Sequence, residues 1–198
     1  DGWPCDLRHR PAAAVRVHRL GARAQRLGRA RTLLESTDLP VDVARSTTNS
    51  PWEIAAHVQL RLASMPAEVI LAYLRHQHAL MAQSYTWNLW GAAYIINGGC
   101  SDDGFEYFRG WLLTWGRDVF QRALEVPDSL AGVVEHMDEA DCEDMINAPF
   151  LAYQAVTGES PSMRPAVRYP ALGEGWDFDD AAEMKGRYPA LFARFGRS

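Results

Sequence analysis

Lysine is almost absent from this sequence, and cysteines and long apolar runs are scarce. The 198 residues contain one lysine against nineteen arginines, and three cysteines, Cys5, Cys100 and Cys142, that form no C-x-x-C pair. This odd, widely spaced set excludes a disulfide framework and is typical of reduced thiols in the cytoplasm. No run of eighteen apolar residues occurs, and no short apolar run near the N-terminus precedes a cleavage site. We therefore expect neither membrane insertion nor secretion.

Charge is distributed unevenly along the chain. Residues 1–31 hold eight arginines against Asp1 and Asp6, whereas the whole chain carries a net charge of −5. A basic arm can contact nucleic acid, but this one has neither interleaved aromatics nor a groove-binding motif, so we do not expect nucleic-acid binding. Its richness in Ala, Arg, Gly and Pro is also typical of a GC-rich gene read from a false start. We interpret residues 1–31 as an arm, disordered or a false start, before one helical domain over 32–198.

Start and stop signals predict helices along most of this domain. Ser50, Pro51 and Glu53 form a capping-box pattern that opens a helix ending near Ala63. The further segments whose apolar residues recur at threes and fours are 66–85, 87–96, 101–119, 138–157 with a break or kink at Pro149, 179–187 and 189–195. A weaker helix is conceivable over Ala12–Glu35.

The pattern as a whole favours an all-α fold. Alternating strand runs and internal repeats are not found, and residues 158–175 are rich in proline and glycine without periodicity. We therefore predict an irregular multi-helix bundle with a loop-rich C-terminal segment.

A long motif runs from Trp87 to Phe120, reading WNLWGAAYIINGGCSDDGFEYFRGWLLTWGRDVF. It resembles the signature of the bacterial family called domain of unknown function 4240. The resemblance extends from about Ser50 to Phe195, because the ending with Gly175–Asp180 and Arg187–Pro189 is also similar. Residues 1–31 do not resemble the helix with a Phe-Trp pair with which members usually begin. The resemblance implies a bacterial protein but no particular activity.

The centre of this motif is the candidate site. Its aromatic side chains at helical spacing are typical of a helix–helix core, although their polar edges also suit a pocket. Ser101, Asp102 and Asp103 stand at a helix start, where their oxygens can accept free backbone N–H groups. The candidate binding residues are Trp90, Tyr94, Asn97, Cys100, Ser101, Asp102, Asp103, Glu106 and Arg109.

The segment also contains a candidate nucleophile and a cluster of carboxylates. Cys100 lies beside a helix start, which favours a thiolate, but no histidine stands in a motif that would place a base against it, so a structural cysteine is the preferred interpretation. Asp102, Asp103 and Glu106 lack a recognised metal-loop geometry, and we predict no metal and no cofactor. The acidic run over 138–144 is interpreted as a solvated helical face.

Two functions remain open. The favoured hypothesis is a non-catalytic regulatory or protein-interaction module in the cytoplasm, with an unknown protein or small-molecule partner and no membrane contact. The alternative is a small-molecule enzyme, a hydrolase or transferase, with its site at Asn97–Arg109. A pocket reached by those side chains would favour the enzyme, and a buried, internally hydrogen-bonded segment would favour the module.

Overall fold

The computed structural model describes residues 40–137, 140–162 and 169–196, and most of this part is helical. These residues form nine α-helices and one 3-10 helix, with no strand among them, which confirms the all-α prediction. The Arg-rich residues 1–31 and the helix expected over Ala12–Glu35 lie outside the described residues. None of the described helices is long and apolar enough to cross a membrane.

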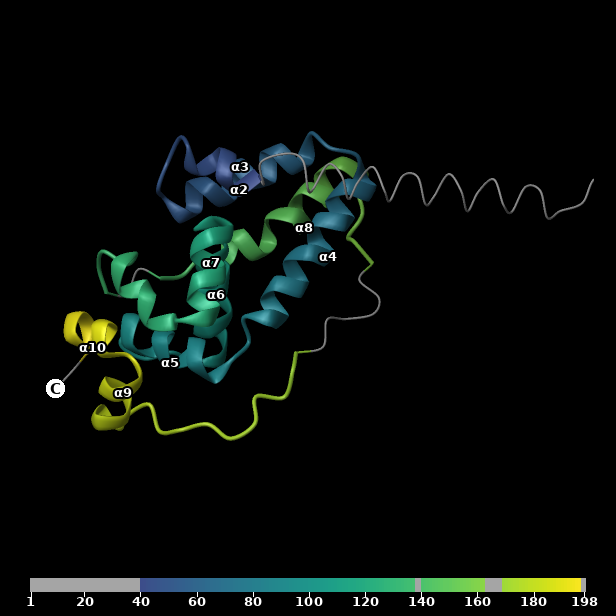
Figure 1. Ribbon diagram of the computed structural model, residues 1–198. Helices are drawn as coiled ribbons and strands as arrows, with labels where there is room; N and C mark the ends of the chain where they lie inside the picture. Colours follow the sequence, from purple (N-terminus) through teal and green to yellow (C-terminus); the bar gives the residue numbers. More distant parts are fainter. Residues whose placement is uncertain (1–39, 138–139, 163–168, 197–198) are drawn as a thin grey trace, which may run out of the picture.

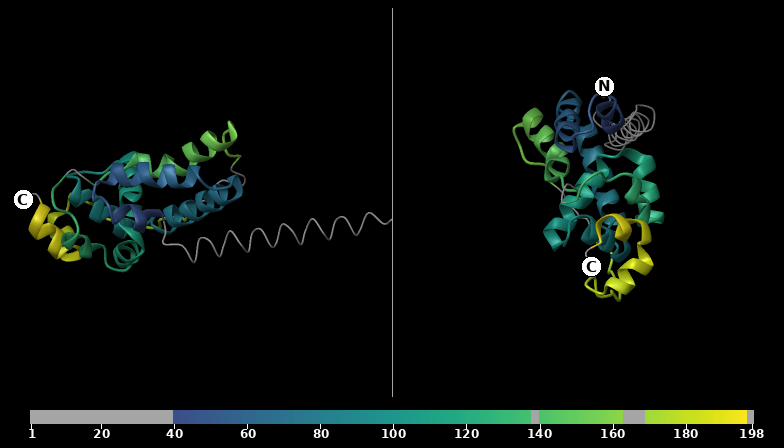
Figure 2. Two further views of the ribbon diagram at one scale, coloured as in Figure 1. Left: turned by 90° about the horizontal axis from the view of Figure 1, so that it is seen from above. Right: turned by 90° about the vertical axis from the view of Figure 1, so that its left-hand side faces the viewer.

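Figure 1 shows the helices in chain order. Their bounds are α2 Pro40–Arg45, α3 Pro51–Ala63, α4 Ala67–Gln83, α5 Trp87–Ile96, α6 Asp102–Leu113, α7 Gly116–Glu125, η1 Pro127–Gly132, α8 Glu143–Thr157, α9 Ala181–Arg187 and α10 Pro189–Phe195. Helix α8 packs against α3, α4 and α6, and α2 packs on α3. The molecule is elongated when seen from above, with α9 and α10 at one end (Figure 2).

Local signals fix the start of α3 and the end of α5 as the sequence predicted. Ser50 caps α3 by accepting a 3.4 Å hydrogen bond from the Glu53 N–H, and Pro51 follows at the first helical position. The reciprocal half of the capping box is absent, because the Glu53 carboxylate accepts from the Thr48 hydroxyl instead. At the end of α5, Gly98 adopts a φ of 63°, and the Gly99 N–H reaches the Tyr94 carbonyl at 2.9 Å. This is the Schellman closure that glycine favours.

The helix expected over 101–119 is in fact two helices. α6 ends at Leu113, and α7 begins at Gly116, whose φ of 78° is unfavourable for residues with a side chain. A Cβ at Gly116 would lie 2.7 Å from the Asp42 carboxylate on α2. The apolar residues keep their helical spacing on both sides of this break, because both helices face the same core. The sequence pattern therefore predicted one helix where the structure has two.

The expected helix over 138–157 is shorter, and its proline does not interrupt it. Residues 138 and 139 lie outside the described part, and α8 begins only at Glu143. Pro149 stands inside α8 and cannot donate to the Met145 carbonyl four residues earlier. The Gln77 side chain of α4 donates to that carbonyl from Nε2 at 3.2 Å. A side chain from another helix thus replaces the missing helical hydrogen bond.

Close approach also brings α6 onto α8. A Cβ at Gly110 would lie 2.4 Å from the Cys142 carbonyl oxygen and 2.9 Å from the Ile146 side chain. Only glycine allows this separation.

The C-terminal segment, loop-rich as predicted, returns along α5. Residues 169–180 run past the lower edge of the helices to α9 and α10 (Figure 1). The Tyr188 hydroxyl donates to the Asn88 carbonyl at 2.7 Å, and the Trp87 indole donates to the Gly173 carbonyl at 3.2 Å. The Asp128 carboxylate accepts from the N–H groups of Ala190 and Leu191 at 3.0 and 2.8 Å, which caps the first turn of α10.

Candidate functional site

The predicted segment between α5 and α6 is tied down by its own hydrogen bonds. The Trp90 indole donates to the Cys100 carbonyl at 3.0 Å, and its ring stacks on Phe105 with centroids 4.6 Å apart. The Asn97 amide donates to the Ala140 carbonyl at 3.1 Å. Trp90 is 8% exposed. These contacts give both residues a role in packing.

Tyr94 faces away from this core toward the C-terminal segment. Its hydroxyl donates to the Asp179 carboxylate at 2.5 Å, and its ring contacts Phe178 with centroids 5.3 Å apart. Tyr94 and Phe178 also line a cavity of about 200 Å³, to which residues of α9 and α10 contribute.

Arg109 is buried rather than presented to a ligand. It is 2% exposed, and its Nη1 donates to the Met81 carbonyl at 2.6 Å. Its guanidinium lies over the rings of Tyr85, Phe105 and Tyr169 at 5.1, 4.9 and 4.9 Å from the centroids. Backbone carbonyls and aromatic faces therefore satisfy this cation.

Cys100 is held as a thiol. Burial raises its pKa to about 12, and the nearby positive charge of Arg109 only partly opposes this. Its Sγ lies 3.8 Å from the Ser101 carbonyl oxygen. Cys100 and Cys142 are both free, and burial likewise raises the pKa of Cys142 to about 11. A thiol protonated to such a high pH is a poor nucleophile at neutral pH.

The start of α6 corrects the predicted capping role of the aspartates. Ser101 is the N-cap and accepts a 3.1 Å hydrogen bond from the Gly104 N–H. Asp102 and Asp103 instead occupy the first turn with exposed side chains, where their charges complement the positive end of the helix dipole.

An acidic face forms around Tyr107. The charge of Glu143, followed by burial and the charges of Asp103, Glu106 and Asp141, raises the pKa of the Tyr107 hydroxyl. The run interpreted as one helical face is thus divided, with Asp141 before α8 and Glu143 at its first residue. In the described part of the chain, no three His, Cys, Asp or Glu side chains group as a metal site.

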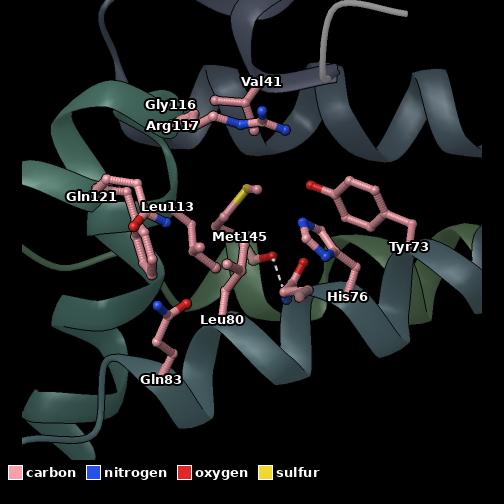
Figure 3. A pocket seen from close by; sticks show the side chains of 12 residues that line it. Val41, Tyr73, His76, Leu80, Gln83, Leu113, Gly116, Arg117, Gln121 and Met145 are labelled. Carbon is pink, nitrogen blue, oxygen red and sulfur yellow. Dashed lines mark hydrogen bonds between the residues drawn. The ribbon is translucent and has the colours of Figure 1, made fainter. Parts of the chain in front are cut away.

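The predicted residues therefore lie in one region but have different structural roles, in packing, in helix capping or on an exposed acidic surface. Their role in binding stays a prediction. A larger pocket lies elsewhere, between α4 and α7, with a volume of about 460 Å³ (Figure 3). We call it the α4–α7 pocket. It is lined by Val41, Tyr73, His76, Gln77, Leu80, Gln83, Leu113, Gly116, Arg117, Phe120, Gln121 and Met145.

The walls of the α4–α7 pocket are apolar and its exposed rim is polar. Leu80, Leu113 and Met145 border the cavity, whereas Arg117 and Gln121 come from α7 (Figure 3). His76, Gln83, Arg117 and Gln121 are exposed, so this side opens to solvent. A volume of this size falls in the range of about 300–1000 Å³ typical of small-molecule sites.

Gln77 supplies the buried polar group of this pocket. It is 2% exposed, and its Nε2 donates to the carbonyls of Met145 and Ile146 at 3.2 and 3.0 Å. These two bonds fix the orientation of the amide. Its Oε1 is buried and has no hydrogen-bond partner among the described residues.

Burial affects the ionisation of two side chains that line the pocket, His76 and Tyr73. Partial burial of the ring, and then the positive charge of Arg117, lowers the pKa of His76. The His76 ring is therefore neutral at pH 7. Burial, helped by the negative charge of Asp42, raises the pKa of Tyr73, so its hydroxyl also stays neutral.

Sequence reasoning missed this pocket, although one signal was present. Tyr73, Gln77 and Leu80 fall on the apolar stripe predicted for the helix over 66–85, and Gln77 is the polar member of that stripe. A polar residue at a core position requires a buried partner. The partner, Met145, lies 68 residues further along the chain, so local periodicity does not reveal it.

The fold and the α4–α7 pocket define a small all-α domain with a cavity of small-molecule size that opens to solvent on one side. The chain belongs to the family described as protein of unknown function DUF4240, whose family model matches residues 41–155. This confirms the family predicted from the sequence. The match spans every residue that lines the α4–α7 pocket, while the similar ending over 175–195 lies beyond it. No curated protein and no solved structure matches the chain.

Proposed function

We propose that this protein is a non-catalytic regulatory module that binds a small molecule in the α4–α7 pocket. The observation that carries the proposal is a cavity of about 460 Å³ with apolar walls and a polar rim that opens to solvent. Cavities of this size and lining are typical of small-molecule sites. A ligand that fits the cavity buries its apolar body against the walls and places its polar group at the rim.

The composition of the pocket supports binding over catalysis. Its lining contains no Cys, Ser, Thr, Asp, Glu or Lys side chain. The remaining acid–base groups are His76 and Tyr73, and Tyr73 is kept neutral. The enzyme alternative at Asn97–Arg109 has little chemical support, because Cys100 stays protonated and Arg109 is engaged with backbone and rings.

A ligand in this position has a route to regulation. Because α2, α4, α6, α7 and α8 all contribute to the lining, a bound molecule stabilises their arrangement relative to one another. We include in the proposal a cytoplasmic, bacterial setting and a single domain over residues 32–198. The free thiols of Cys100 and Cys142, together with the family resemblance, support that setting.

Filling the pocket tests the proposal. Thermal unfolding is measured with and without a set of aromatic alcohols and acids, for the wild type and for Leu113→Phe, which places a larger ring in the cavity. Leu60→Phe is the matched control, because Leu60 is 68% exposed on α3 and does not line the pocket. We expect the compounds to raise the Tm of the wild type and control but not of Leu113→Phe. Equal shifts in all three proteins, or no shift in any, would contradict the proposal.

The acidic face around Tyr107 favours a second candidate function, contact with a basic protein segment. Asp103, Glu106, Asp141 and Glu143 all act on the Tyr107 hydroxyl from α6 and the start of α8. Exposed carboxylates of one sign attract a basic partner, and salt screens the attraction. An arginine-rich peptide is expected to bind the wild type at low salt and to bind a Glu106→Gln, Glu143→Gln variant more weakly. Equal binding by the two proteins excludes this candidate.

A further inference from the structure

The charge of the α4–α7 pocket rim restricts the ligand that it suits. Among the lining residues the one permanently charged side chain is Arg117, and no carboxylate lines the pocket. The whole chain carries a net charge of −5, so this rim is a local positive site on an acidic protein. Arg117 has no ion-pair partner among the described residues.

The carboxylate of Asp42 lies close to this rim. It lies beside Gly116, the residue before Arg117, and its negative charge acts on Arg45 and Tyr73. Asp42 is exposed and is not part of the lining. The Arg117 guanidinium therefore stays available on the side that faces the cavity, where it lies across from Tyr73 and His76 (Figure 3).

From these positions we propose that the ligand is an amphipathic organic monoanion, a carboxylate on an apolar body. This inference rests on the proposed function of the pocket. Arg117, with the neutral His76 as a second donor, holds the carboxylate at the exposed rim. Leu80, Leu113 and Met145 enclose the apolar body.

A monoanion fits this rim better than a phosphate ester. The planar guanidinium accommodates the two oxygens of a carboxylate side by side. One guanidinium balances a single negative charge, whereas a phosphate monoester carries almost two at neutral pH and needs further cations. The other polar rim residues, Gln83 and Gln121, are uncharged.

The test compares naphthaleneacetic acid with naphthaleneacetamide, which has nearly the same shape without the charge. Affinities are measured by isothermal titration calorimetry for the wild type, Arg117→Gln and Arg122→Gln. Arg122 is the matched control, because it is an exposed arginine of the same helix that does not line the pocket. Phenyl phosphate is a third probe.

We expect the acid to bind the wild type and Arg122→Gln about tenfold more tightly than the amide does. The affinity of Arg117→Gln for the acid should be about tenfold lower than that of the wild type, while its affinity for the amide is unchanged. Equal affinities of acid and amide for the wild type would overturn the inference, as would tighter binding of phenyl phosphate. If both compounds bind equally and Leu113→Phe abolishes both, the pocket function stands and only the ligand class is wrong. If neither binds, the proposed function fails too.

Discussion

Gln77 on α4 donates a hydrogen bond to the carbonyl oxygen of Met145 on α8, at a point where the helix itself has no donor to offer. Nε2 of Gln77 and the Met145 oxygen are 3.2 Å apart, and Pro149 stands where the next N–H of the helix would be. One side chain thereby supplies the hydrogen bond that Pro149 cannot make and joins α4 to α8.

The coupling between Gln77 and Pro149 is testable by a double-mutant cycle. Gln77→Leu leaves the Met145 carbonyl buried without a donor and is expected to lower the free energy of unfolding by about 1–3 kcal/mol. Pro149→Ala restores the helical N–H, so the same Gln77→Leu change in that background should be destabilising by clearly less. Urea unfolding of the four proteins measures the coupling, expected in the range of about 0.5–3 kcal/mol. Strictly additive effects would show that Gln77 does not replace the helical bond.

Arg109 joins α6 to α4 and to the C-terminal segment. Arg109→Lys keeps the charge but loses the planar fork that reaches both the Phe105 and Met81 carbonyls and stacks on Tyr169. We expect a loss of about 2 kcal/mol in unfolding free energy. Arg122→Lys, at an exposed position of α7, should change stability by less than about 0.5 kcal/mol. Similar values for the two variants would refute the role of the buried guanidinium.

At the start of α6, Ser101 and its two acidic neighbours contribute to stability in different ways. Ser101→Ala removes the acceptor of the Gly104 N–H and is expected to be destabilising by about 1 kcal/mol. Asp102→Asn and Asp103→Asn lose only a dipole interaction of about 0.3–1 kcal/mol, and Asp103→Asn also relieves repulsion from its acidic surroundings. Thermal unfolding compares the three. An Asp→Asn variant less stable than Ser101→Ala would show that the carboxylate charge contributes more to the start of α6 than the Ser101 cap does.

The raised pKa of Cys100 predicts slow alkylation. With a pKa of about 12 the thiolate fraction at pH 8 is very small, so iodoacetamide should modify Cys100 in the folded protein at least about a hundredfold more slowly than in urea. Cys142, with a pKa of about 11, should behave alike. Mass spectrometry of the peptides separates the sites. Rapid labelling of Cys100 at pH 7 would revive the enzyme hypothesis.

His76 and His78 predict a loss of stability in mild acid. Burial lowers the pKa of both, with the Arg117 charge adding to the effect at His76 and the Glu106 charge opposing it at His78. Below about pH 6.5 the unfolded chain therefore binds protons that the folded protein does not, and stability falls as the pH falls. A His76→Gln, His78→Gln variant should lose less Tm between pH 7 and pH 5 than the wild type. A drop equal to that of the wild type would show that other groups dominate this range.

Much of the helical framework was predictable because the signals that set it act over a few residues. Ser50 caps the first turn of α3, and Gly98 closes the last turn of α5. The start of α3 and the end of α5 therefore follow from the residues found there. The motif over Trp87–Phe120 likewise identifies the family without reference to the fold. The predicted binding role of the segment around Cys100 rested on spacing alone, and spacing does not say whether a side chain is buried.

By itself the sequence determined the helical class, most helix ends and the family, since capping and periodicity are local properties of the chain. Only the tertiary structure decided that the stripe over 101–119 divides at Gly116, that α8 runs through Pro149 and that Arg109 is enclosed by rings. The α4–α7 pocket was decided at the same level. The residues that line it are spread along the chain between Val41 and Met145. Its buried amide, Gln77, is held by a hydrogen bond to Met145, 68 positions further along the chain. Such contacts depend on how whole helices pack, which no local pattern encodes.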